Sequence, residues 1–122
     1  MPRKLFIALF IPVVLSLSVT GALAHARLKK SDPPAGGAVA TSPNEIRLQF
    51  SEGIEPKFSG ITLTRGGETV PTGPAAIDPN DKATLVVPIG APLTVGVYKI
   101  NWHAVSADTH KTEGSFNFEV RQ

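Results

Sequence analysis

The side chains of this 122-residue chain best suited to metal chemistry are two histidines, His25 and His110, and one aspartate, Asp108. If His25 becomes an N-terminus, it offers one metal ion two nitrogens, its α-amine and its imidazole Nδ1, which close a chelate ring. A second imidazole and a carboxylate oxygen would then complete a square-planar or tetragonal set of N and O donors. That donor set in that geometry is diagnostic of Cu(II).

Asp108 and His110 are placed to supply the second imidazole and the carboxylate. In an extended chain, residues two positions apart point to the same side, so both side chains are expected to face one ion. They follow a long predicted strand, which would hold them at the end of a sheet. A lone Asp-x-His is usually a solvated loop, and signal cleavage can expose any residue, so the residues alone leave a copper site and a solvated loop both open.

Two further residues have a structural and a functional interpretation each. His103 follows Trp102, so in a strand it points to the opposite face and is expected to meet solvent; the alternative is an auxiliary metal partner. Glu52, in the segment Phe50-Ser51-Glu52-Gly53, ends a predicted strand. It is either a surface charge at a turn or a carboxylate that orients the amine and imidazole of His25 without binding the metal.

The requirement for a free amine at His25 is met by the sequence that precedes it. Met1–Lys4 is positively charged, residues 5–19 are apolar, and Ala22-Leu23-Ala24 fits the small-x-small cleavage rule. We therefore expect residues 1–24 to be a cleaved secretory signal peptide and residues 25–122 to be the mature domain, exported to the periplasm without stable membrane insertion. The alternative is an uncleaved membrane anchor, for which the apolar run is marginal against the ~20 residues of a spanning helix.

Composition excludes several classes of function. The precursor has 12 Lys and Arg against 10 Asp and Glu, and loss of Arg3 and Lys4 leaves 10 of each, so no basic field remains for nucleic acid. The chain has no cysteine, which excludes thiolate zinc and blue-copper sites. Its one methionine is Met1, so the mature chain has no sulfur ligand.

The elements that must position these residues are β-strands. Alternation of apolar and polar residues dominates the mature part, and turn-forming Pro, Gly, Asn and Asp separate the runs. About seven short strands predict an all-β fold, an immunoglobulin-like sandwich or a Greek-key barrel. The predicted core consists of Ile46, Leu48, Phe50, Ile61, Leu63, Leu85, Val87, Tyr98, Ile100, Trp102, Phe116, Phe118 and Val120.

Three motifs of the chain resemble those of a known family. The first is residues 25–28 (HARL) with residues 31–36 (SDPPAG), and the second is residues 48–55 (LQFSEGIE) with residues 58–60 (FSG). The most specific is the third, residues 102–110 (WHAVSADTH), followed by Gly114 and Phe116. The first is similar to the start of the mature CopC-like periplasmic copper-resistance proteins, and the other two are similar to their second and C-terminal motifs; the Trp-His pair looks most like the YobA-type branch.

The resemblance implies a seven-stranded immunoglobulin- or cupredoxin-like β fold and a Cu(II) site formed by His25, Asp108 and His110, with Glu52 beside it. It also implies a monomer that captures, buffers or delivers copper for copper homeostasis and resistance, with an inner-membrane transporter of the CopD type as a possible partner. Some family members carry a methionine-rich Cu(I) loop. The mature sequence has no methionine, so we expect a Cu(II)-only binder.

Two rival functions remain at the sequence level. Lytic polysaccharide monooxygenases also use an N-terminal histidine on copper, but they are generally larger and have an extended flat face for the polymer. The chain shows no nucleophile elbow and no phosphate-binding Gly-rich loop, so we expect no enzyme. The other rival is a plain immunoglobulin-like assembly domain, which would keep its binding surface after His25→Ala.

Overall fold

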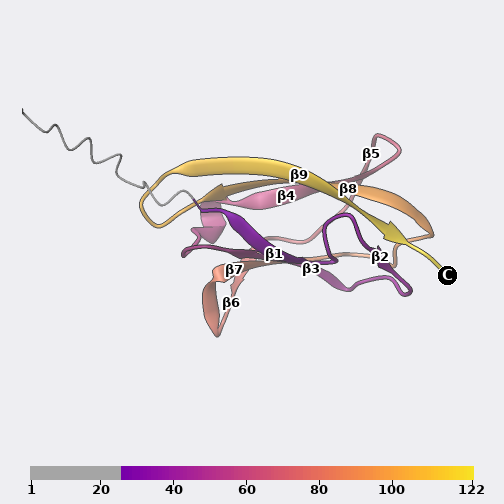
Figure 1. Cartoon of the computed structure of the whole chain (residues 1–122), viewed down its shortest axis with the longest axis horizontal. Coiled ribbons are helices and arrows are strands. Elements are labelled where there is room, and N and C mark those ends of the chain that lie inside the picture. The colour runs from indigo at the N-terminus through magenta and orange to yellow at the C-terminus, as the bar shows by residue number, and fades with distance from the viewer. Residues whose placement is uncertain (1–25) are drawn as a thin grey trace, which may run out of the picture.

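The computed structural model describes residues 26–122, so the predicted signal peptide and His25 lie outside the described residues. Nine strands and one short 3₁₀ helix make up this part (Figure 1). In chain order they are β1 (Leu28–Asp32), β2 (Ala38–Val39), β3 (Glu45–Phe50), η1 (Pro56–Phe58), β4 (Gly60–Arg65), β5 (Glu68–Val70), β6 (Ala76–Asp78), β7 (Asp81–Pro88), β8 (Gly96–Val105) and β9 (Lys111–Val120). No helix in residues 26–122 has the length and apolarity to cross a membrane.

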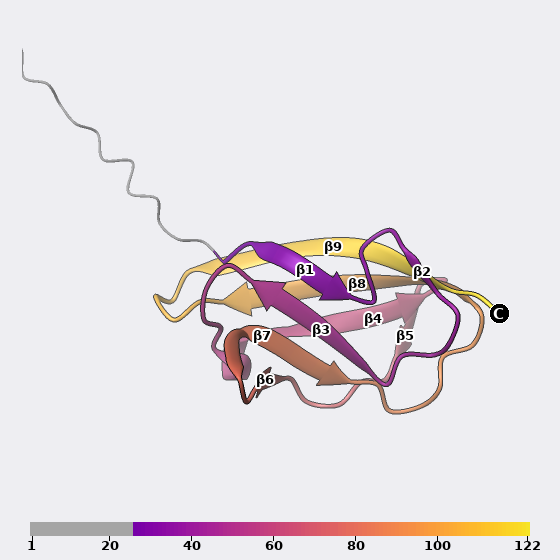
Figure 2. The ribbon, with the colours of Figure 1, turned by 60° about the horizontal axis from the view of Figure 1, so that its bottom comes forward.

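The strands form two sheets that pack face to face (Figures 1 and 2). One sheet has the order β1-β3-β7-β6 and the other the order β2-β9-β8-β4-β5. All pairings are antiparallel except that of β2 with β9. The predicted all-β sandwich is confirmed; nine strands are found against the expected seven or so, and three of the nine are edge strands of only two or three residues.

The core lies between the sheets and follows the alternation of each strand. Ile46 and Leu48 of β3 are fully buried, and Phe50 meets Trp102 of the opposite sheet edge-on at 5.2 Å between ring centroids. Tyr98 and Phe118 stack at 5.4 Å within the five-stranded sheet. Every predicted core residue belongs to this core or packs against it, and Ile61, Trp102 and Phe116 are only half-buried.

Strands β8 and β9 form a long hairpin that positions the candidate site. Their register runs from Gly96↔Val120 to Val105↔Lys111, so both strands traverse the length of the sandwich. The loop between them, residues 106–110, lies at the end of the sandwich where β1 begins (Figures 1 and 2). The topology thus brings the beginning of the described chain to the loop that carries Asp108 and His110.

Candidate metal centre

Asp108 and His110 lie in a loop that its own backbone closes. The amide of Ser106 donates to the carbonyl of His110 at 3.0 Å, and the amide of Thr109 donates to the carbonyl of Ser106 at 2.8 Å. Thr109 has φ +72°, a left-handed conformation that is uncommon for a β-branched residue. The segment is therefore a tight turn and not the extended chain on which the i, i+2 argument relied.

The turn still brings the two predicted ligands together. Asp108 Oδ2 lies 3.1 Å from His110 Nδ1, and the two side chains are 42% and 36% exposed. The other carboxylate oxygen, Oδ1, accepts hydrogen bonds from the Ser106 hydroxyl and, at 3.3 Å, from the His110 amide. The pair thus places a carboxylate and an imidazole side by side on partly exposed side chains, which suits a metal that takes N and O donors.

Ser106 stabilises the charged form of the aspartate. Its side chain is fully buried, and its hydroxyl donates to the carboxylate. This hydrogen bond is the main reason that the pKa of Asp108 lies below its ordinary value, and smaller contributions come from the amide and imidazole of His110. A hydrogen bond to the charged form favours that form, so Asp108 stays a carboxylate, as a ligand must.

The beginning of the described chain is anchored beside this loop. Ala26 is 1% exposed, and its carbonyl accepts a hydrogen bond of 2.9 Å from the Thr112 hydroxyl of β9. Arg27 donates its amide to the Ser51 hydroxyl at 2.8 Å and accepts from the Ser51 amide at 2.8 Å. The two residues that follow the predicted first ligand, His25, are thus fixed, Ala26 to β9 and Arg27 to the residue that follows β3.

Glu52 lies on the segment that contacts both the beginning of the described chain and the β8–β9 loop. The carbonyl of Gly53 accepts from the amide of Ala107 at 3.1 Å, and Ile54 forms an isolated bridge with Ser106. Glu52 itself is half-buried, and its Oε1 is buried without a hydrogen-bond partner within residues 26–122. Because buried polar atoms are nearly always satisfied, this oxygen indicates a polar group beyond the described residues or a bound ion or water.

His103 lies on β8 and is exposed on the face opposite Trp102, as its strand position predicts. It pairs across the sheet with Gly60 and Glu113. Its imidazole lies over Gly60, where an added Cβ would come within 3.2 Å of Cε1. Together with the exposed Phe58 it lines a hollow of about 810 Å³ that Thr109 and Lys111 also border.

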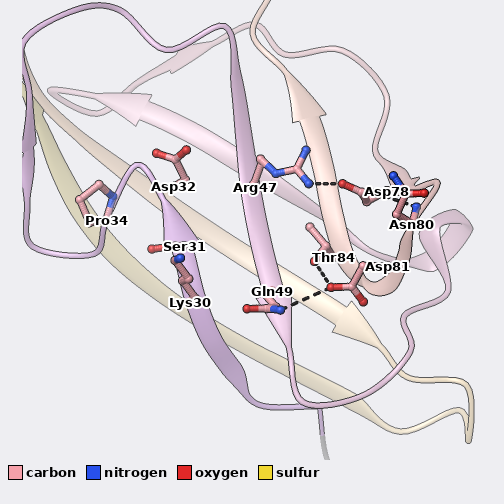
Figure 3. A pocket seen from close by; sticks show the side chains of 10 residues that line it. All are labelled: Lys30, Ser31, Asp32, Pro34, Arg47, Gln49, Asp78, Asn80, Asp81 and Thr84. Atoms are coloured by element: carbon pink, nitrogen blue, oxygen red, sulfur yellow. Dashed lines mark hydrogen bonds and ion pairs between the residues drawn. The ribbon is translucent and has the colours of Figure 1, made fainter.

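A second hollow, of about 650 Å³, lies on the outer face of the four-stranded sheet (Figure 3). Several of its charged and polar groups bind one another: Arg47 pairs with Asp78, and Asp81 accepts from Gln49 at 3.4 Å and from Thr84 at 2.7 Å. None of the described residues that line it is a histidine. The lining residues are Lys30, Ser31, Asp32, Pro34, Arg47, Gln49, Asp78, Asn80, Asp81 and Thr84.

The loop of Asp108 and His110 therefore remains the better candidate for a metal. Within residues 26–122 no group of three or more His, Asp and Glu side chains is placed to hold an ion. Two of the three predicted ligands are described, and they lie together.

The sequence did not predict the roles of Ser106, Ser51 and Thr112. A hydroxyl two positions before an aspartate is a local signal that could have indicated Ser106. The contacts of Ser51 and Thr112 span 24 and 86 positions, and no local pattern indicates them.

Comparisons with known proteins agree on one family. The model of the CopC domain matches residues 28–121. Protein YobA of Escherichia coli K12 is 40% identical over 120 residues, which cover 98% of this chain and 96% of that protein. Copper resistance protein C of Pseudomonas syringae pv. tomato is 38% identical over 125 residues, 98% of this chain and 97% of that protein.

Solved structures give the same fold. The crystal structure of PcoC, described as a methionine-rich copper resistance protein from Escherichia coli, superposes with a TM-score of 0.73 at 39% identity. The match covers 80% of this chain and 100% of PcoC. The β-sandwich is thus common to this chain and to PcoC.

Proposed function

This chain belongs to the CopC domain family, and from that premise we propose that it binds Cu(II) through His25, Asp108 and His110 and serves copper homeostasis and resistance in the periplasm. Copper is its cargo: the protein captures the ion, buffers it or delivers it, and no turnover is involved. Relatives at 36–38% identity carry the name copper resistance protein C, which supports this role.

The observation that carries the proposal is the position of Asp108 and His110 beside the anchored start of the chain. Thr112 comes two residues after His110, and its hydroxyl holds the carbonyl of Ala26 at 2.9 Å. One peptide bond separates the Cα atoms of neighbouring residues by about 3.8 Å. A histidine bonded to Ala26 is therefore within reach of the loop, where its amine and imidazole can join the carboxylate and the second imidazole.

The buried Oε1 of Glu52 favours a role for this carboxylate in orienting His25 without binding the metal. Its neighbour Ser51 holds Arg27, and Gly53 on its other side holds Ala107. A carboxylate between these two points is placed to accept a hydrogen bond from the amine or imidazole of His25 and so to orient them.

The restriction to Cu(II) rests on the lack of sulfur donors. PcoC is described as methionine-rich, whereas the only methionine of this chain is Met1. Cu(I) prefers soft thioether or thiolate ligands, and Cu(II) prefers nitrogen and oxygen. A binder of this composition would hand on Cu(II), for example to an inner-membrane transporter of the CopD type, and would act as a monomer.

The test is a Cu(II) titration of protein that begins at His25, followed by electron paramagnetic resonance. A parallel sample carries an added methionine before His25, which locks the amine in a peptide bond. We expect tight one-to-one binding with a nitrogen-rich tetragonal spectrum, and loss of most of the affinity in the extended form.

His110→Ala and His103→Ala form a matched pair for the same titration. Both variants remove one partly or fully exposed imidazole close to the β8–β9 loop, and only His110 lies beside Asp108. We expect His110→Ala to lose the tetragonal signal and His103→Ala to keep it. Equal, weak binding in all forms would overturn the proposed site and favour an assembly domain without copper.

A further inference from the structure

Thr112 is the side chain of β9 that touches the beginning of the described chain. Its hydroxyl donates to the Ala26 carbonyl at 2.9 Å, although the two residues are 86 positions apart. Ser51, which directly follows β3 of the other sheet, makes the second anchor through both backbone hydrogen bonds of Arg27. The first described residues are thus fixed at two points, one on each layer of the sandwich.

The position of Thr112 in β9 explains why its hydroxyl must make this bond. Every second residue of a strand lies on the same face. Thr112 therefore shares the inward face of β9 with Gly114, Phe116, Phe118 and Val120. A hydroxyl on such a face is costly to bury without a partner. Ala26 is itself buried among core residues, so its carbonyl has the matching need for a donor.

We infer that Thr112 is a positioning residue of the proposed copper site, because its hydroxyl holds the N-terminal ligand against the loop of Asp108 and His110. The inference rests on the proposed function, since it concerns how His25 is held in position at the metal site. Thr112 touches no metal in this role: it acts through the Ala26 carbonyl, and it lies on the strand that begins directly after His110.

Thr112→Val tests the role with little change of shape, since it replaces the hydroxyl by a methyl group. Only one neutral hydrogen bond is lost, so we expect Cu(II) binding to weaken about two- to tenfold. Thr112→Ser keeps the hydroxyl and should bind nearly as the natural protein does. Thr62→Val, an exposed threonine of β4 on the same sheet, is the control and should have no effect.

A double-mutant cycle with His25→Ala separates positioning from general stability. If Thr112 acts through the N-terminal ligand, the loss of affinity caused by Thr112→Val should be clearly smaller once the imidazole of His25 has been removed and only the α-amine is left. In metal-free protein, Thr112→Val should also speed amide hydrogen exchange of Arg27, which follows Ala26. Faster exchange needs no copper, so it reports on the anchor alone.

The outcomes distinguish the inference from the proposed function. Unchanged Cu(II) affinity in Thr112→Val, or an equal loss with and without His25, would overturn the positioning role while the copper site stands. Binding by the natural protein that does not depend on His25 would overturn the proposed function and this role with it. Faster exchange of Arg27 would then identify Thr112 as a structural tie only.

Discussion

At the scale of single residues, the orientation of the Asp108 carboxylate in the candidate site is set by the hydroxyl of Ser106. Ser106 is fully buried, and its hydroxyl fixes one carboxylate oxygen of Asp108. The other oxygen is thereby left to face His110 Nδ1 at 3.1 Å. A ligand held in one orientation before the metal arrives loses less freedom on binding, which favours affinity.

Ser106→Ala should therefore raise the pKa of Asp108 toward its ordinary value. The Ser106 hydroxyl is the main cause of the lowered pKa, and removing a donor to the charged form disfavours that form. The measurement is a pH titration of the Asp108 carboxyl by nuclear magnetic resonance in metal-free protein. Ser115→Ala, on the exposed side of β9, is the control; an Asp108 pKa equally low in both variants would contradict the role of Ser106.

The pairing of Asp108 with His110 could be predicted from the sequence, but the reason given for it was wrong. An extended chain would place the two side chains on one side, whereas the structure uses a turn with Thr109 at φ +72°. The tie between Thr112 and Ala26 could not be predicted, because it depends on how two distant segments meet. His25, Asp108 and His110 as metal ligands stay a prediction.

At the scale of elements, the β8–β9 hairpin depends on a contact between Trp102 and Gly114. These residues face each other across the two strands. A Cβ at Gly114 would lie 2.6 Å from Cζ2 of the indole ring, so the ring occupies the space that any other residue would need. The glycine lets the half-buried Trp102 pack against Phe50 of the opposite sheet.

Gly114→Ala should destabilise the protein by about 1–3 kcal/mol, because an overpacked core forces the ring or the strand to move. Urea unfolding followed by fluorescence measures the change, and the chain's single tryptophan reports from the altered contact itself. The exposed Ser115→Ala on the same strand is the matched control. Equal stability of the two variants would show that the indole relocates without cost.

The long strands could be predicted from alternation, and the short ones could not. Residues 46–50 and 98–104 alternate clearly, and they lie in β3 and β8. β1 was missed because LKKSD shows no such alternation, and β2 because two residues carry no periodicity. The position of β2 parallel to β9 depends on the whole chain, since residues far apart form it.

At the scale of the whole molecule, the outer face of the four-stranded sheet carries a network of opposite charges (Figure 3). The pKa of Asp78 is lowered mainly by the Asn80 amide and then by Arg47, and the pKa of Asp81 mainly by the Thr84 hydroxyl. The pKa of Arg47 is raised, chiefly by its hydrogen bond to Asp78. The network therefore favours the folded state while its carboxylates are charged.

Stability should fall as the pH drops below about 4, where unfolded aspartates begin to take up protons. Because the folded pKa values are lower than the unfolded ones, this contribution is complete above the unfolded pKa and is lost as the pH passes down through the folded pKa. Urea unfolding at several pH values measures it. Asp78→Asn with Asp81→Asn should make the decline shallower; an unchanged slope would assign the acid sensitivity elsewhere.

Strand β9 runs the length of the sandwich, and this decides where the protein is best attached to a surface or a reporter. The strand begins beside His110 and ends at Val120, and ten residues of strand span about 30 Å. The candidate site and the C-terminal end of the described chain thus lie at opposite ends of the sandwich (Figure 1). A tether joined after Val120, whether to an electrode or to a fluorescent reporter, would therefore be attached far from the loop of Asp108 and His110 and would leave the N-terminal amine of the mature protein unmodified.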